Sequence, residues 1–221
     1  MNIIVSEEIV SVCPDFVGAA VEAQVKNTPF CEALWGEIRT LQAEVVHTLT
    51  NEQLKNLPGI AATRRVYKAC GKDPSRYRPA SEQLMRRLLQ GKDLYQIDTL
   101  VDLVNLASMK YGYSIGGFDA DKLDGQTLTL GVGREDEPYE GIGRGVLNIA
   151  GLPVYRDRVG GFGTPTSDHE RTKMTLSTTH LLVLINGYDG NEQRVAENAR
   201  YIQELLKHYA DSDGGTVYIY K

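Results

Sequence analysis

The sequence predicts an α+β (mixed α/β) fold with a helical N-terminal half, a β-rich middle and a C-terminal strand–helix–strand unit. Three observations support this prediction. Apolar residues recur at helical spacing in the first half, glycine-containing turns separate short β-rich runs after Gly112, and a long amphipathic stripe near the end lies between two strand-like runs. No linker-like stretch divides the chain, so we expect residues 1–221 to form a single domain.

In the first half, residues 1–12 are predicted as one or two short strands that end before Pro14, because Ile and Val alternate weakly there. Helices are predicted at residues 30–46, 61–70, 81–89 and 97–109. Ser81 follows Pro79 and is expected to cap the third of these helices.

In the second half, Gly and Asp-Gly or Asn-Gly turns separate the predicted elements. Strands are predicted at residues 127–130, 145–148, 153–157, 180–185 and 216–220. A helix is predicted at residues 192–209, where Val195, Ala199 and Ile202 fall on one stripe.

The composition is that of an ordinary globular domain. The chain has 221 residues, 42% of them hydrophobic, and a formal net charge of −5, which excludes collagen, repeat arrays and disorder. No apolar run approaches the ~18 residues that a membrane span needs, and the first residues lack the pattern of a signal peptide. Three scattered cysteines without a CxxC pair predict free thiols and a cytoplasmic location.

The net charge is unevenly distributed. Residues 64–92 contain nine basic and two acidic residues, a local charge of +7, so the remaining chain carries −12. A basic segment on an acidic protein indicates an anionic partner that binds at one place. The alternative is a solvated helix face.

The familiar catalytic and cofactor motifs are missing. Gly131-Val-Gly133 and Gly141-Ile-Gly143 do not join a buried strand to a helix, as a dinucleotide loop requires, and no P-loop occurs. The four histidines show no zinc-ligand spacing. Ser167, Asp168 and His169 are adjacent, so their side chains diverge and cannot form a catalytic relay. The sequence therefore predicts neither a cofactor nor a metal.

The segment 160–172 is rich in glycine and hydroxyl residues. Glycines let the backbone approach a ligand, and hydroxyls and N–H groups suit a loop that holds a carbonyl-containing group. The alternative is a wide hairpin turn capped by Ser, Thr and Asp.

Several short motifs, read together, resemble the free-standing B3/B4-domain proteins, which are similar to the B3/B4 region of the phenylalanyl-tRNA synthetase β subunit. The motifs are Lys72-Asp73-Pro74-Ser75-Arg76-Tyr77-Arg78-Pro79, Val101-Asp102-Leu103-Val104-Asn105, Gly116-Gly117-Phe118-Asp119, Tyr139-Glu140-Gly141-Ile142-Gly143, and Pro165-Thr166-Ser167-Asp168 with Glu170-Arg171-Thr172. In the synthetase this region hydrolyses tyrosine that has been mischarged onto the phenylalanine tRNA.

The resemblance implies the site residues. Asn105 matches the asparagine of a helix motif, Glu137 lies near a Gly-Glu step, and Gly160-Gly161 matches a glycine loop. Gly116 stands where the synthetase has a histidine, which predicts added space in the pocket. We expect Glu137 and Asn105 to orient water or to bind the polar end of the amino acid. The residues expected to bind the aminoacyl ester are Gly116, Gly117, Gly160, Gly161, Thr164, Thr166 and Ser167.

The same resemblance gives the basic segment a role as the contact for the acceptor end of tRNA. The residues expected to bind its phosphates are Arg64, Arg65, Arg76, Arg78, Arg86 and Arg87. Some arginines of this segment are expected to be structural and to pair with Glu82 or another acid.

Three functions remain open: a hydrolase that clears mischarged tRNA in trans, a non-catalytic tRNA or RNA-binding module, and a protein that binds a free amino acid or a related metabolite. The glycine at 116 favours the last two, and the basic segment favours the first two.

Overall fold

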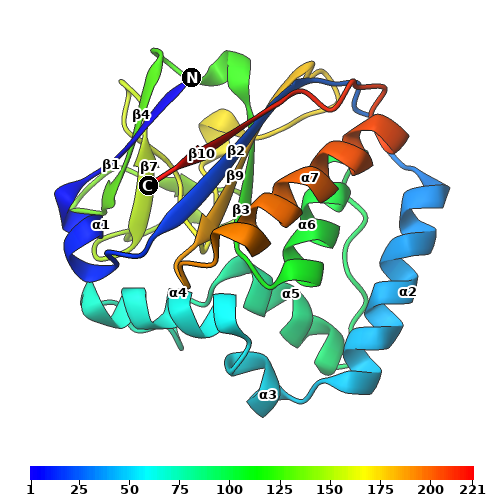
Figure 1. Cartoon of the computed structure of the whole chain (residues 1–221), viewed down its shortest axis with the longest axis horizontal. Helices are drawn as coiled ribbons and strands as arrows, with labels where there is room; N and C mark the ends of the chain where they lie inside the picture. Colours follow the sequence, from blue (N-terminus) through cyan, green and yellow to red (C-terminus); the bar gives the residue numbers. More distant parts are fainter.

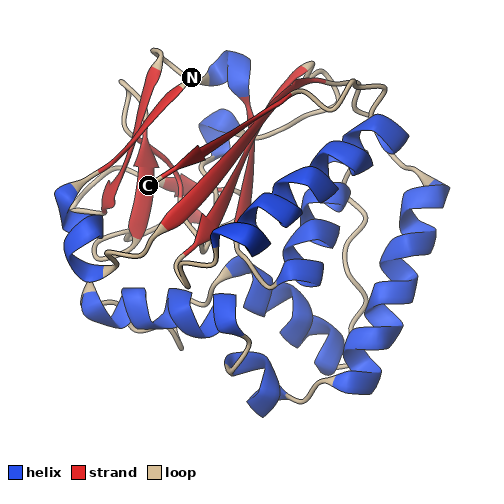
Figure 2. Cartoon of the chain, viewed as in Figure 1, coloured by secondary structure: helices blue, strands red, loops and turns tan.

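The computed structural model describes all 221 residues and contains two four-stranded sheets with helices packed mainly on one of them. Figure 1 follows the chain through these elements, and Figure 2 shows the strands on one side of the molecule and most helices on the other. The mixed α+β class predicted from the sequence is confirmed.

The helices are α1 (Glu7–Val12), α2 (Glu32–Thr48), α3 (Asn51–Lys55), α4 (Pro58–Ala69), α5 (Ala80–Leu89), α6 (Thr99–Tyr111) and α7 (Glu192–Tyr209), with short 3-10 turns η1 (Ala120–Lys122) and η2 (Glu170–Thr172). The strands are β1 (Asn2–Val5), β2 (Val17–Gln24), β3 (Ile115–Asp119), β4 (Thr127–Val132), β5 (Glu140–Gly141), β6 (Gly145–Val146), β7 (Pro153–Arg156), β8 (Gly161–Gly163), β9 (His180–Gly187) and β10 (Thr216–Tyr220).

One sheet has the strand order β10-β2-β9-β3. Its central strand β2 pairs antiparallel with β9 over its whole length, from Val17 opposite Gly187 to Gln24 opposite His180, and with β10 on its other edge. The C-terminal strand–helix–strand unit is thus split, because β2 lies between β9 and β10. The apolar stripe of α7 packs over this sheet in a core of 31 buried residues.

The second sheet has the order β1-β4-β7-β8, in which β1 and β4 are parallel and the other pairs are antiparallel. A second core of 16 buried residues contains side chains of both sheets, among them Phe118 of β3 and Phe162 of β8. Their rings meet edge to face with centroids 4.9 Å apart. This contact brings the edge strand β3 next to β8, where the candidate site lies.

Most predicted elements agree with the structure, and three predictions are wrong or incomplete. Residues 7–12 form helix α1 instead of a strand. The N-cap position of α5 is Pro79, and the Ser81 hydroxyl is buried 3.4 Å from the hydroxyl of Ser114 instead of capping the helix. Strands β2, β3, β5 and β8 and the short helix α3 were not predicted. No helix is long and apolar enough to span a membrane.

Helix α6 is fixed at both ends and carries the candidate residue Asn105. At its start, Asp98 Oδ1 accepts a hydrogen bond from the Val101 N–H at 2.9 Å. At its end, Gly112 adopts a left-handed conformation with φ of 73°, which glycine tolerates without steric cost, and its N–H bonds to the Ser108 carbonyl. The strand β3 follows directly.

We predict that Asp98→Ala lowers the free energy of unfolding by about 1 kcal/mol, because the first turn of α6 loses its side-chain cap. Urea unfolding followed by circular dichroism measures this change. Asp98→Asn is the matched control, because asparagine caps helices about as well as aspartate. Equal stability of the Ala variant and the wild type would contradict the capping role.

Candidate functional site

Two of the six arginines predicted to bind tRNA are held by a buried carboxylate. The Glu82 side chain is fully buried in α5, and its oxygens lie 2.9 Å from Arg64 Nη1 and 2.7 Å from Arg86 Nε. Arg64 also donates to the Pro74 carbonyl at 3.1 Å. A buried carboxylate without partners destabilises the folded state, so these bonds give Arg64 and Arg86 a structural role and make them unavailable to tRNA phosphates.

The other four arginines differ in whether their guanidinium groups already have partners within the protein. Arg87 donates to the Asp93 carbonyl and stacks on the Tyr95 ring at 3.9 Å. Arg65, Arg76 and Arg78 are exposed and form no ion pair. These three therefore remain available to an anionic partner.

Gln83 of α5 ties three distant segments together. Its Nε2 donates to the carbonyls of Arg78 and Thr166, at 2.7 and 3.2 Å, and its Oε1 accepts from Arg144 Nη2 at 2.6 Å. The Ala80 N–H reinforces this junction by donating to the Pro165 carbonyl at 2.7 Å. The connection before α5 and the β5–β6 hairpin thus both lie against the turn at residues 164–168.

This turn uses its own hydroxyl groups to satisfy its backbone. Thr164 Oγ1 accepts from the N–H groups of Thr166 and Ser167, at 3.3 and 3.0 Å, and donates to the Ser167 carbonyl at 2.8 Å. The Gly160 N–H is likewise bound by Asp157 Oδ1 at 3.1 Å. The backbone donors expected to hold an ester are therefore engaged within the protein.

Glu137, predicted to act in catalysis, is paired with Arg156. Its two carboxylate oxygens accept from Arg156 Nε and Nη2 at 2.7 and 2.6 Å, and its Oε2 also accepts from the Arg134 N–H. Burial alone would raise the pKa of Glu137, but these hydrogen bonds outweigh it and lower the pKa. Glu137 is thus a fixed negative charge at neutral pH. A Cβ on Gly161 would stand 3.3 Å from Glu137 Oε1, so the structure brings these two predicted residues together.

The expected space at Gly116 is filled by an aromatic ring. A Cβ on Gly116 would lie 2.5 Å from Cζ of Phe118, and a Cβ on Gly163 would lie equally close to the same atom. Phe118 itself is only 1% exposed. The prediction that the glycine leaves an open pocket is therefore wrong, because Phe118 covers both glycines.

Asp168 emerges as the titratable group of this region. A Cβ on Gly116 would stand 3.3 Å from Asp168 Oδ1, and the Gly117 N–H lies near the same carboxyl. The residue is partly buried, and burial raises the pKa of its carboxyl to about 8, although the Gly117 N–H opposes this rise. No cation compensates the charge, since Arg171 pairs with Asp157 at 2.8 Å.

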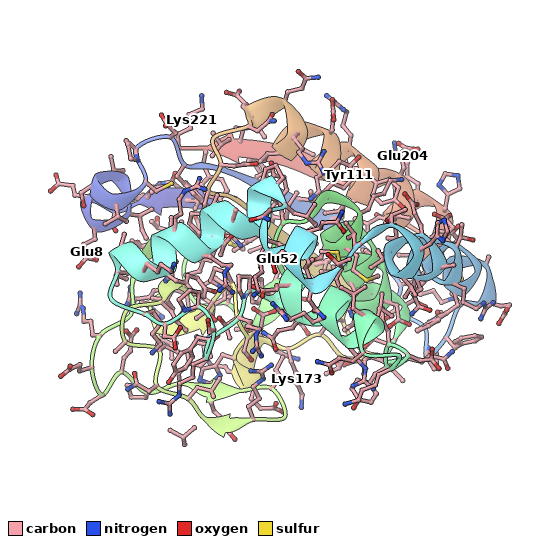
Figure 3. The ribbon with its side chains drawn as sticks, turned by 90° about the horizontal axis from the view of Figure 1, so that it is seen from below. Glu8, Glu52, Tyr111, Lys173, Glu204 and Lys221 are labelled. Carbon is pink, nitrogen blue, oxygen red and sulfur yellow. The ribbon has the colours of Figure 1, made fainter.

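The neighbours of Asp168 do not form a catalytic relay with it. His169 Nδ1 accepts from the Arg171 N–H at 2.9 Å, and the Ser167 carbonyl accepts from the Tyr139 hydroxyl at 2.7 Å. No group of three or more His, Cys, Asp or Glu side chains is placed to hold a metal ion. Figure 3 labels Lys173, which follows η2 beyond this segment.

Asn105 lies apart from the Glu137 pair. It is partly exposed on α6 and makes no side-chain hydrogen bond, one residue after Val104, which packs against Gly117 of β3. None of the five main surface hollows is lined by Asn105, Gly116 or Glu137. The predicted glycines of β3 and β8 thus lie beside the 164–168 turn, and Phe118 packs between them.

Sequence reasoning missed three residues that the structure brings to this junction: Gln83, Arg144 and Asp168. The sequence offered one signal: Asp168 ends the motif Pro165-Thr166-Ser167-Asp168 and is the only acidic residue between Arg158 and Glu170. Nothing local marks Gln83 or Arg144, because their partners lie far away along the chain.

Comparison with known proteins gives one family match. A family model described as the B3/4 domain matches residues 62–209. Among solved structures, an N-terminal fragment of the phenylalanyl-tRNA synthetase β subunit from Pyrococcus horikoshii is similar, with a TM-score of 0.49 and 14% sequence identity. The match covers 98% of this chain and 50% of that one, so the chain spans about half the length of the fragment. No curated protein matches.

We predict that the Asp168 carboxyl makes the stability of the protein fall as the pH rises from about 4 towards 8. The native state binds this proton more tightly than the unfolded chain, so the free energy of unfolding decreases with pH, by at most about 1.4 kcal/mol per pH unit. Urea unfolding of the wild type and Asp168→Asn between pH 5 and 8 measures the difference between the two proteins. Parallel pH profiles would contradict the raised pKa.

Proposed function

The chain belongs to the B3/4 domain family, and on this basis we propose that it is a tRNA-associated protein that receives the acceptor end of a tRNA at the 164–168 turn. One observation carries the proposal. Three exposed arginines without acidic partners, Arg76, Arg78 and Arg144, lie on segments that meet at this turn. Phosphate groups are the anions that such a cluster would bind in a sequence-independent way.

The finer proposal is that the protein hydrolyses an aminoacyl ester in trans, with Asp168 as the general base. Water attacks the ester carbonyl carbon and gives a proton to the Asp168 carboxylate. The bond between the carbonyl carbon and the ribose oxygen then breaks, and the proton passes to that oxygen, which leaves as a hydroxyl. A carboxylate with a pKa of about 8 is a stronger base than an ordinary aspartate, which supports this role.

The residues predicted from the resemblance keep supporting roles in this proposal. Glu137 lies beside Gly161 and is held there by Arg156, so in this proposal it fixes the wall of the site. Asn105 has an uncommitted amide that would bind a polar end. Gly116 and Gly117 present a strand edge to Asp168.

The second candidate is a tRNA-binding module without catalysis. Two contacts favour it, because Phe118 covers Gly116 and the N–H donors of the turn are already bound. Substrate must then displace part of this packing for the hydrolase proposal to hold. The third candidate, a free amino acid bound at the same residues, gains no support from the five main hollows, because none of them is lined by Asn105, Gly116 or Glu137.

We predict that excess protein releases tyrosine, phenylalanine or another amino acid from charged tRNA faster than buffer does. The enzymatic rate should rise about tenfold per pH unit below pH 8 and level off above it, because only ionised Asp168 accepts the proton. Uncatalysed alkaline hydrolysis continues to rise instead. Release of radiolabelled amino acid from pH 6 to 9 measures both.

Two variants test the assignment. Asp168→Asn should lower the rate by about 100-fold or more and remove the plateau. Glu137→Ala should lower the rate but keep the pH dependence and the tRNA affinity, because Glu137 does not titrate in this range. If no amino acid is released above the buffer rate, the hydrolase proposal fails. The tRNA-binding proposal is tested independently by the salt dependence of binding.

We predict that tRNA binding is weak and steeply salt-dependent. Replacing Arg76, Arg78 and Arg144 by Gln should reduce the slope of log K against log salt by about 2–3, since each phosphate contact contributes about 0.7–0.9. Filter binding from 25 to 200 mM salt measures the slope. The control replaces Arg39, Arg200 and Lys207, exposed cations on α2 and α7, and should keep the wild-type slope. An equal change in both triple variants would show a general charge effect and refute the assigned surface.

A further inference from the structure

A second region of the molecule forms a hollow that the proposed tRNA site does not use. It lies where α2, α5, the C-terminal end of α6 and the start of α7 meet, and its volume is about 210 Å³. Its apolar lining includes Leu41, Val45, Leu49, Leu57, Met85 and Met109. Figure 3 labels Tyr111, which also lines it.

The hollow reaches the main core. Val45, Met85 and Met109 are only 4%, 1% and 4% exposed, so the hollow ends on buried side chains. Its volume is below the roughly 300–1,000 Å³ of sites for drug-sized ligands, which limits the occupant to a small molecule. Apolar walls with a few polar groups at the entrance are typical of such sites.

Three charged side chains surround this apolar space without neutralising one another. Glu44 of α2 carries the negative charge, and Lys110 of α6 and Arg194 of α7 carry the positive charges. None of the three forms an ion pair, although all line the same hollow, and Lys110 Nζ lies 3.9 Å from the centroid of the Tyr201 ring beside it. Arg194 is held in place because its Nε and Nη2 donate to the Tyr111 carbonyl at 3.3 and 3.1 Å, which leaves Nη1 without a partner.

We propose that this hollow binds a free α-amino acid with an apolar side chain. Arg194 and Lys110 would bind the α-carboxylate, Glu44 would bind the α-ammonium group, and the side chain would enter the space above Met85 and Met109. A purely apolar molecule would leave the three charges unused, and a simple carboxylate would leave Glu44 opposite an anion. The zwitterion is the ligand that complements both signs.

The proposal stands apart from the tRNA site, because none of the residues that line the hollow belongs to that site. It is therefore tested separately. Isotope-labelled protein is titrated with L-leucine, with 4-methylpentanoate, which lacks the ammonium group, and with 3-methylbutylamine, which lacks the carboxylate. Amide chemical shifts report both the affinity and the location.

We expect leucine to shift the amides of residues 109–112 and 45–49 and to bind at least about tenfold more tightly than either analogue. Glu44→Gln should weaken leucine but leave 4-methylpentanoate unchanged or tighter. Lys110→Gln should weaken both. Glu52→Gln and Lys55→Gln, exposed and unpaired on α3 outside the hollow, are the matched controls and should bind like the wild type. Figure 3 labels Glu52.

Three results would overturn the proposal. The first is the absence of leucine-induced shifts at millimolar concentrations. The second is equal affinity for leucine and 4-methylpentanoate, which would mean that the ammonium group is not recognised. The third is unchanged leucine binding in both Glu44→Gln and Lys110→Gln, which would place any binding elsewhere.

Discussion

The buried carboxylate of Glu82 is the interaction on which the candidate tRNA site depends. A charge in this position is tolerated only when it is paired, and Glu82 is paired twice, with Arg64 of α4 and Arg86 of its own helix. Arg64 extends the network to the Pro74 carbonyl and so fixes the connection between α4 and α5. That connection carries Arg76 and Arg78. The arginines that bind within the fold thereby position the arginines that do not.

At the junction of β3, β8 and the 164–168 turn, most polar groups likewise already have partners within the protein. Arg156 neutralises Glu137, Thr164 satisfies the backbone of its own turn, and Phe118 occupies the space above Gly116. Asp168 is the exception, because its carboxyl is partly buried and no cation pairs with it. Enclosed groups whose charge is uncompensated have perturbed pKa values, which are common at functional sites. The acidic chain thus presents a local basic surface beside one carboxyl that is mostly neutral at pH 7.

The sequence predicts the amphipathic elements well and the sheet-dependent ones poorly. Helix α7 and strand β10 have the predicted bounds, because a long apolar stripe and a short β-rich run are local signals. Strand β2 is rich in Ala and Gly, residues with low strand propensity, and is a strand because β9 and β10 flank it. In α1, the spacing of Ile9, Val10 and Val12 fits both a helix and a strand. The acidic residues Glu7 and Glu8 in the first turn favour the helix.

For the site, the sequence reveals the motifs but not the contacts or the charge state of their side chains. The resemblance located Glu137 and Gly116, yet the Arg156 partner lies nineteen residues from Glu137 and the covering ring comes from Phe118. Both effects arise from packing between elements. The pKa of Asp168 is likewise a property of enclosure, which has no signature in the local sequence.

The position of β2 also bears on how the chain is made. This apolar strand is synthesised early, but both strands that pair with it, β9 and β10, come from the end of the chain. During translation β2 therefore has no partner for either edge until β9, which begins at His180, has been made. Contacts this distant in sequence form slowly, and an unpaired apolar strand is prone to aggregate. The central sheet is thus completed only when β9 and β10 have been made, and until then the nascent chain carries an apolar strand whose two edges are unpaired.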